Sequence, residues 1–277
     1  MRFIERIMTI IRRITGDDIW VYSAQASFYI LLAAVPFVML MLSLIRFWLP
    51  LDADDLLLTA QTLLPSAVWD FVSDFVDELF HRPNIPLVSA TAFTTLWTAS
   101  RGFAAAERGV RRVYRLPKKG FFSRIGTSLF YTLALAAVLL LTLVLLVFGK
   151  WLYTFFAMEN LSFMRFSQKI GWLRSVIYFV AVCLLFGLVF HAFTDWKFGY
   201  FKHLPGAVFS TIGWMIFSHL YSVYIEIFAN YSYIYGSLTA IVLMMLWLYS
   251  CMIILLLGAE LNMLLFERLQ QKGTKEL

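Results

Sequence analysis

The chain has 277 residues, of which 61% are apolar and only 14% are charged, and its mean hydropathy is +0.77. A soluble domain usually contains about 45–50% apolar and about 25% charged residues. The composition therefore excludes most classes of soluble enzyme and predicts an integral membrane protein. A membrane chain of this size normally forms one bundle, so we predict a single membrane domain over residues 1–277.

Six apolar stretches have the length of a membrane span, or nearly so. A bilayer core of about 30 Å needs about 20 residues of helix. The stretches are residues 24–48, 85–106, 125–149, 175–194, 204–229 and 237–266. The third is the most continuous, and the second is the least apolar because it holds several threonines. The fold class that we predict is an all-α integral membrane protein, a bundle of six transmembrane helices.

The basic residues, which give the chain a net charge of +6, are divided unequally between the two sides of this bundle. Of the 23 Lys and Arg residues, 17 fall on the side that holds both termini and six on the other. Cytoplasmic segments carry the excess of Lys and Arg, so we place both termini in the cytoplasm, with a C-terminal tail over 267–277. The loop 52–84 agrees, because it holds seven acidic residues and one Arg; the loop 150–174 disagrees mildly, with four basic residues.

Two segments outside the spans show amphipathic helical patterns. In residues 1–20, apolar side chains recur at helical spacing beside four Arg. This pattern fits a helix in the inner headgroup region and equally a cytoplasmic helix packed against the bundle. The external loop 52–84 has a second apolar stripe with acidic residues beside it. Its negative charge disfavours anionic lipid, so we predict that this helical loop docks on the outer rim of the bundle.

Short motifs spread over nearly the whole chain resemble one known family. They are AQASFY (24–29), AVPF (34–37), LWTASRG (96–102), RVY (112–114), LPGA (204–207), YGSL (235–238), WLY (247–249) and GAELN (258–262). In this order they resemble the YihY/BrkB family, with Glu107 standing where a small or apolar residue is expected. The resemblance implies a multi-pass, six-helix protein of the bacterial inner (cytoplasmic) membrane. It also implies links to virulence and envelope integrity, a suggested role in lipid transport, and an old label as a tRNA-processing ribonuclease.

The sequence offers little catalytic chemistry. It contains no nucleotide-binding motif and no metal-like spacing among its four histidines, so we expect no cofactor, no metal and no catalytic residue. The largest cytoplasmic loop is basic and contains one carboxylate, Glu107. Its cations can attract phosphate, but the loop does not supply the acid–base or metal cluster that RNA hydrolysis needs. We expect its cations to contact anionic lipid headgroups. These cations are Arg108, Arg111, Arg112, Arg115, Lys118 and Lys119.

The fifth predicted span carries a face of small residues. Gly206, Ser210 and Gly213 lie on this face at spacings of four and three, where small residues allow two helices to approach closely. Two further positions are candidates for packing or for a hinge. Pro36 loosens the first span, and Gly236 belongs to the YGSL motif.

The opposite face of the fifth span is polar, with His219, Ser222 and Glu226 at helical spacing. Lipid cannot satisfy polar side chains, so this stripe should face protein or a wet cavity. Simple packing and a transport role both remain open. Arg46, near the outer end of the first span, lies at a depth comparable with Glu226, and we predict an ion pair between them.

Three functions are consistent with these patterns. The leading hypothesis is a transporter-like bundle that handles a lipid or other amphiphile through a polar cavity open toward the outer leaflet. The second is a non-transporting scaffold for envelope assembly, in which the polar stripe only packs. The third and least favoured is a membrane-bound ribonuclease, supported by the basic loop and the family's old label. Membrane lipids are the expected partners, with a possible amphiphilic substrate and no specific nucleic acid.

Overall fold

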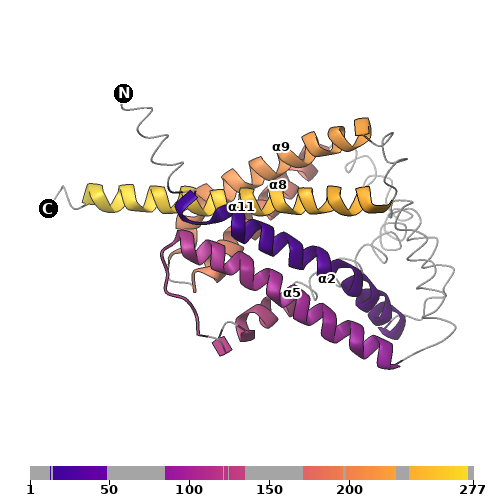
Figure 1. Cartoon of the computed structure of the whole chain (residues 1–277). Helices are drawn as coiled ribbons and strands as arrows, with labels where there is room; N and C mark the ends of the chain where they lie inside the picture. The colour runs from indigo at the N-terminus through magenta and orange to yellow at the C-terminus, as the bar shows by residue number, and fades with distance from the viewer. Residues whose placement is uncertain are drawn as a thin grey trace, which may run out of the picture.

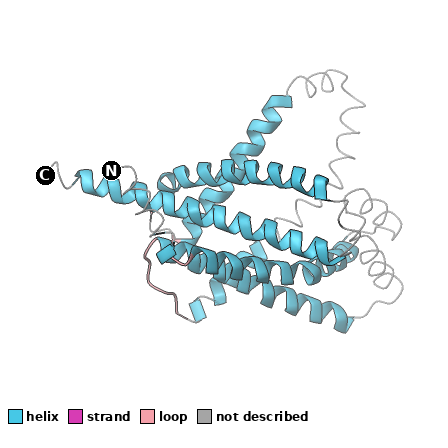
Figure 2. Cartoon of the chain, turned by 45° about the horizontal axis from the view of Figure 1, so that its top comes forward, coloured by secondary structure: helices cyan, strands magenta, loops and turns pink. Residues whose placement is uncertain are grey.

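The structure, a computed structural model, describes residues 13, 15–48, 85–120, 122–123, 125–134, 171–195, 198–228 and 237–273. All regular structure in these ranges is helical and none of it is strand, which confirms the all-α fold class (Figure 2). The predicted helix in the loop 52–84 lies outside the described residues. So do most of the predicted N-terminal helix and residues 135–149 of the third predicted span.

The described helices follow the order of the predicted spans. They are α2 (Ile19–Trp48), α5 (Ile85–Val113), α8 (Gly171–Phe193), the short 3-10 helix η1 (Tyr200–His203), α9 (Leu204–Phe228) and α11 (Ser237–Gly273). Residues 125–134 form a further helical segment at the start of the third predicted span. Among the described residues, 200–225 and 241–269 are long and apolar enough to cross a membrane, and 19–34, 125–134 and 178–193 are shorter apolar helices.

Four helices are longer than the spans predicted for them. α2 begins before residue 24, α5 continues past residue 106, α8 begins before residue 175, and α11 continues past residue 266. The 37 residues of α11 measure about 55 Å at a rise of about 1.5 Å per residue, which exceeds the bilayer core of about 30 Å. α2 runs through Pro36, whose role as a hinge stays a prediction.

Two turns determine where α5 and α8 end. After α5, Arg115 is left-handed with φ of 52°, and the backbone N–H of Leu116 donates to the carbonyl of Arg111 at 2.9 Å. This is the Schellman pattern of helix termination, and Pro117 cannot continue a helix. After α8, Asp195 is also left-handed, with φ of 53°, a conformation that Asp and Asn adopt more readily than most residues.

α11 occupies the centre of the described bundle and contacts α2, α5 and α9. α2 and α5 lie side by side, and α8 packs against α9 (Figure 1). Small residues on α5 allow its neighbours to come close. A Cβ added at Gly102 would lie 3.0 Å from the side chain of Ile30 on α2, and one at Gly109 would lie 2.9 Å from the side chain of Leu256 on α11.

The crossing of α9 and α11 is equally close. A Cβ added at Gly206 would collide with the carbonyl oxygen of Gly258 and with the side chain of Asn262. The backbone N–H of Gly206 donates to Asn262 Oδ1 at 2.7 Å, and Ser210 Oγ donates to a carbonyl of α11 at 3.2 Å. A Cβ at Gly213 would also contact α11. The face of small residues in the fifth predicted span is therefore the face that α9 turns toward α11.

The outward surface of the bundle is apolar. Large side chains with substantial exposure include Leu184, Leu185 and Leu188 on α8, and Ile216 and Leu220 on α9. Soluble monomers rarely expose apolar patches larger than a few hundred Å². These helices therefore present to their surroundings the kind of surface that lipid, and not water, covers favourably.

Candidate functional site

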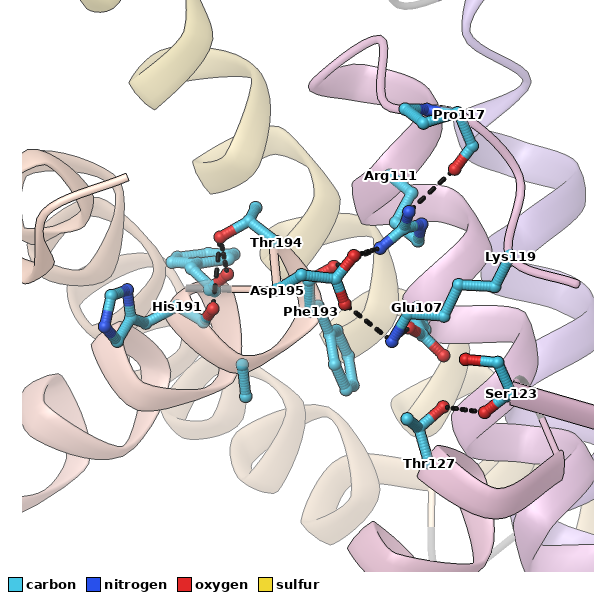
Figure 3. A network of polar contacts seen from close by, with 12 residues as sticks. Glu107, Arg111, Pro117, Lys119, Ser123, Thr127, His191, Phe193, Thr194 and Asp195 are labelled. Carbon is cyan, nitrogen blue, oxygen red and sulfur yellow. Dashed lines mark hydrogen bonds and ion pairs between the residues drawn. The ribbon is translucent and has the colours of Figure 1, made fainter. Parts of the chain in front are cut away.

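Four charged side chains meet where α5, the loop after it and the end of α8 converge (Figure 3). Glu107 and Arg111 lie four residues apart on α5, Lys119 belongs to the loop, and Asp195 directly follows α8. Helical residues at this spacing are neighbours on one face, so α5 presents these two charges to the same surroundings. We call these four residues the four-charge network.

Lys119 lies between the two carboxylates. Its Nζ is 2.6 Å from Glu107 Oε1 and 2.7 Å from Asp195 Oδ1. The second oxygen of Asp195, Oδ2, accepts a hydrogen bond from Nη1 of Arg111, whose Nη2 donates to the carbonyl of Pro117 at 2.7 Å. Asp195 therefore bridges two cations, and the loop after α5 is held against the helix from which it departs.

The four side chains are not equally buried. The exposed fractions are 2% for Glu107, 7% for Arg111 and 10% for Lys119, but 32% for Asp195. Two positive and two negative charges balance, which is the condition under which charges can be held away from water without a prohibitive desolvation cost. Asp195 forms the solvent-facing side of an otherwise buried cluster.

The pKa values of two members favour the ionised state. Burial alone raises the pKa of the Asp195 carboxyl, but hydrogen bonds from Lys119 and Arg111 outweigh burial and bring this pKa below its ordinary value. Burial alone lowers the pKa of the Lys119 ammonium, but hydrogen bonds to Asp195 and Glu107 outweigh it and raise this pKa. Asp195 and Lys119 are therefore both charged near neutral pH.

A second polar cluster surrounds the fully buried side chain of His203. The hydroxyl of Tyr114 lies 3.0 Å from Nδ1 of His203, and Oγ1 of Thr194 lies 3.5 Å from Nε2. Asn262 Nδ2 donates to the backbone carbonyl of His203 at 3.2 Å. Burial raises the pKa of the Tyr114 hydroxyl well above its usual range. The cluster joins the ends of α5 and α8 to η1 and α11. One of its members, Thr194, directly precedes Asp195 of the four-charge network.

Ion pairs of a more exposed kind connect the segment before α2 to the end of α5 and to α11. Glu267 of α11 lies 2.8 Å from Arg13 and 3.3 Å from Arg115, and Arg112 lies 3.9 Å from Asp17. Exposed pairs of this kind contribute only about 0–1 kcal/mol each. They show that the segment preceding α2, the end of α5 and the extension of α11 meet at one end of the bundle.

The six cations predicted to contact lipid headgroups occupy different surroundings. Arg111 is buried and Lys119 is largely covered in the four-charge network, and Arg108 donates a hydrogen bond to Gln25 of α2 at 3.0 Å. The other three are exposed at the end of α5 and in the loop after it: Arg112, Arg115 and Lys118. Contact with anionic lipid stays a prediction, and Arg111 and Lys119 are paired within the chain instead of facing solvent.

Part of the predicted polar cavity falls within the described side chains. His219 and Ser222 have exposed side chains on α9. The side chains of Arg46 and Glu226 lie outside the described part of the structure, as does Gly236. The Arg46–Glu226 ion pair and the cavity therefore stay predictions.

The sequence did not identify Asp195 as a site residue, and it left Glu107 without a role. Two signals for Glu107 were present: its spacing of four residues from Arg111, and its departure from the family pattern. No local pattern marks Asp195, which is 84 positions from Arg111 along the chain. Only the packing of α8 near α5 brings these two residues together.

The network is suited to hold charges and not to act as a general base. Both carboxylates lie within hydrogen-bond distance of a cation, so neither is free to act as a general base. In the part of the chain that the structure describes, no three His, Cys, Asp or Glu side chains form a group that could hold a metal ion.

Comparisons with known proteins give relatives along nearly the whole chain. The family described as virulence factor BrkB matches residues 10–276. A putative ribonuclease-like protein, YfkH, of Bacillus subtilis (strain 168) is 33% identical over 250 residues, which cover 89% of this chain and 90% of the relative. A UPF0761 membrane protein of Psychromonas ingrahamii is 24% identical over 267 residues, covering 94% and 87% respectively. No solved structure matches.

Proposed function

The chain belongs to the virulence factor BrkB family, and on that premise we propose that it is a transporter-like protein of the bacterial inner membrane that moves a lipid or another amphiphile. It forms one membrane domain with six spans and both termini in the cytoplasm. The four-charge network then lies at the cytoplasmic end of the bundle and closes it there. A contribution to envelope integrity follows from moving lipid between leaflets.

The observation that carries this proposal is that α5 and the loop after it are joined to the end of α8 by ion pairs. Asp195 contributes both pairs that join them, one to Arg111 and one to Lys119. Ionisable groups at or near membrane depth are costly and are typical of substrate pathways. Apolar packing can separate only by exposing apolar surface, whereas an ion pair can exchange its partner for water or for a charged ligand.

Two other functions fit these residues less well. A ribonuclease requires a free base or a metal-bound water, and the carboxylates of the network are neutralised by Lys119 and Arg111. The support for that activity is the name of the Bacillus subtilis relative, together with the basic loop and the family's old label. A scaffold for envelope assembly does not need ion pairs that open and close one end of the bundle. It is the alternative that a failure of transport would favour.

Reconstitution into vesicles tests the proposed activity. We expect the purified protein to accelerate the passage of a fluorescent short-chain phospholipid between leaflets, relative to protein-free vesicles. The same preparation should leave tRNA intact with and without divalent metal ions. If folded protein in vesicles moves no lipid, the scaffold is the better explanation. RNA cleavage that persists through purification and is abolished by mutation of this chain would support the ribonuclease.

The proposed orientation has its own test. We expect a reporter fused after Leu277 to lie in the cytoplasm and one inserted near Asp54 to lie on the external side of the membrane. The reason is the excess of Lys and Arg on the side of the termini. Paired alkaline phosphatase and fluorescent-protein fusions measure this directly. Finding both reporters on one side of the membrane would contradict the six-span arrangement.

A further inference from the structure

Asp195 differs from the other three members of the four-charge network in how it is held. Its side chain is 32% exposed, whereas those of Arg111 and Lys119 are 7% and 10% exposed. Like Lys119, and unlike Glu107 and Arg111, it lies outside a helix, in the left-handed turn after α8. Asp195 is therefore the member that solvent reaches most easily and the one that can turn away with the least rearrangement of the bundle.

Without Asp195, Arg111 and Lys119 would leave two cationic donors facing one space. Both now bind the same carboxylate, Arg111 through Oδ2 and Lys119 through Oδ1, so their spacing suits two oxygens of one anion. Phosphate presents such a pair of oxygens, and Arg recognises them with directed hydrogen bonds. Nε of Arg111 is buried without a hydrogen-bond partner in the described part of the chain, which leaves one more donor on this guanidinium.

The charges that remain select the kind of anion. Glu107 stays 2.6 Å from Lys119 on the buried side of the network, so the site without Asp195 contains two positive charges and one negative charge. A ligand with a single negative charge restores the balance that Asp195 now provides. A phosphodiester carries one negative charge, whereas a phosphate monoester carries about −1.5 to −2 at pH 7.

We infer that Arg111 and Lys119 form a binding site for the phosphodiester group of an amphiphile, and that Asp195 occupies this site here as an internal substitute for the ligand. The inference rests on the proposed function, because it names the ligand class that the same network handles. Binding replaces both ion pairs of Asp195 and keeps the pair between Glu107 and Lys119. It thereby releases the ionic connection between α5 and the end of α8.

Asp195→Asn tests the inference because the amide keeps the shape of the side chain and tolerates left-handed backbone, but gives up the negative charge. The probe is dihexanoyl-phosphatidylglycerol, titrated calorimetrically into the purified full-length protein in detergent. We expect Asp195→Asn to bind this lipid at least about tenfold more tightly than the wild type. Adding Arg111→Lys to Asp195→Asn should remove most of the gain, since lysine lacks the planar set of donors with which Arg111 binds an anion oxygen and the carbonyl of Pro117 together.

Asp18→Asn is the matched control. Asp18 is exposed and also left-handed, with φ of 55°, and it belongs to the turn that precedes α2. The substitution removes the same charge from the same backbone conformation outside the network. It should leave the affinity for the lipid unchanged.

Three further probes separate the parts of the ligand. Dihexanoylglycerol has the chains without phosphate and should show no gain in Asp195→Asn, so an equal gain would overturn the phosphodiester site. Glycerophosphoglycerol has the phosphodiester without chains and should bind more weakly than the lipid; equal binding would overturn the amphiphile as the ligand. Dihexanoyl-phosphatidic acid should gain less than the diester, and a larger gain would overturn the charge argument.

The remaining outcomes are equally decisive. Affinities of Asp195→Asn and wild type within twofold of each other would overturn the inference. If neither Asp195→Asn nor Asp195→Ser folds, it is also overturned, because displacement requires the fold to survive without these ion pairs. Lipid binding without passage between leaflets would contradict only the proposed transport. Passage between leaflets with no effect of Asp195→Asn on binding would contradict only the site.

Discussion

Arg111→Ala is expected to lower the free energy of unfolding by about 3 kcal/mol. Removing one partner of a buried ion pair costs about 3–5 kcal/mol, because the remaining charge stays buried and unpaired. The lower end of that range applies here since Asp195 is partly exposed. The variant also loses the hydrogen bond from Arg111 to the carbonyl of Pro117 at 2.7 Å. Denaturant or thermal unfolding in detergent measures the change.

The neighbouring residue provides the control. Arg112→Ala removes the same side chain from the same helix end, but Arg112 is half exposed and its ion pair with Asp17 spans 3.9 Å. Such a pair is worth about 0–1 kcal/mol, so we expect little change in stability. If Arg111→Ala and Arg112→Ala destabilise the protein equally, the four-charge network does not have the energetic role described above.

Gly206→Ala is expected to destabilise the bundle by about 1–3 kcal/mol, the usual cost of inserting a methyl group into a closely packed contact. The new Cβ would collide with the carbonyl of Gly258 and the side chain of Asn262. Backbone cannot move aside as the end of a flexible side chain can. Moving α9 and α11 apart to make room for the methyl group would also strain the hydrogen bond from Gly206 N–H to Asn262, which is 2.7 Å long. The same unfolding measurement applies.

Gly126→Ala is the control for helix propensity. Gly126 lies in the helical segment 125–134, and a Cβ there would meet no atom within 4 Å. Alanine should stabilise this segment by about 0.5–1 kcal/mol, because glycine loses more backbone freedom on folding. The two Gly→Ala changes therefore have opposite expected signs. A Gly206→Ala protein as stable as the wild type would contradict the close crossing of α9 and α11.

Periodicity and composition predicted the helical fold well, and the small-residue face of α9 is a clear example. Gly206, Ser210 and Gly213 share that face because helical spacing alone decides which residues do so. Helix ends were harder to predict. A hydropathy pattern follows the apolar core and not the backbone, so it stopped before the polar continuation of α5 that carries Glu107 and Arg111.

The candidate site was only half predictable, for a different physical reason. The cations of the loop after α5 are visible as a charge run, but their partners are not. Whether Lys119 faces lipid or a carboxylate depends on where Asp195 lies, and that depends on how α8 packs near α5. A sequence records the charges of an ion pair but not their contact when the two residues are 84 positions apart, as Arg111 and Asp195 are.

That separation also sets the order in which the charges emerge during synthesis. At about 5–20 residues per second, Asp195 leaves the ribosome roughly 4–17 s after Arg111. For that interval the segment around Arg111 and Lys119 has an uncompensated surplus of positive charge, the signal that retains a loop on the cytoplasmic side. Asp195 then arrives and, together with Glu107, balances the charges of Arg111 and Lys119. In the proposed orientation, the same two cations first direct insertion of the nascent chain and afterwards become part of its folded interior.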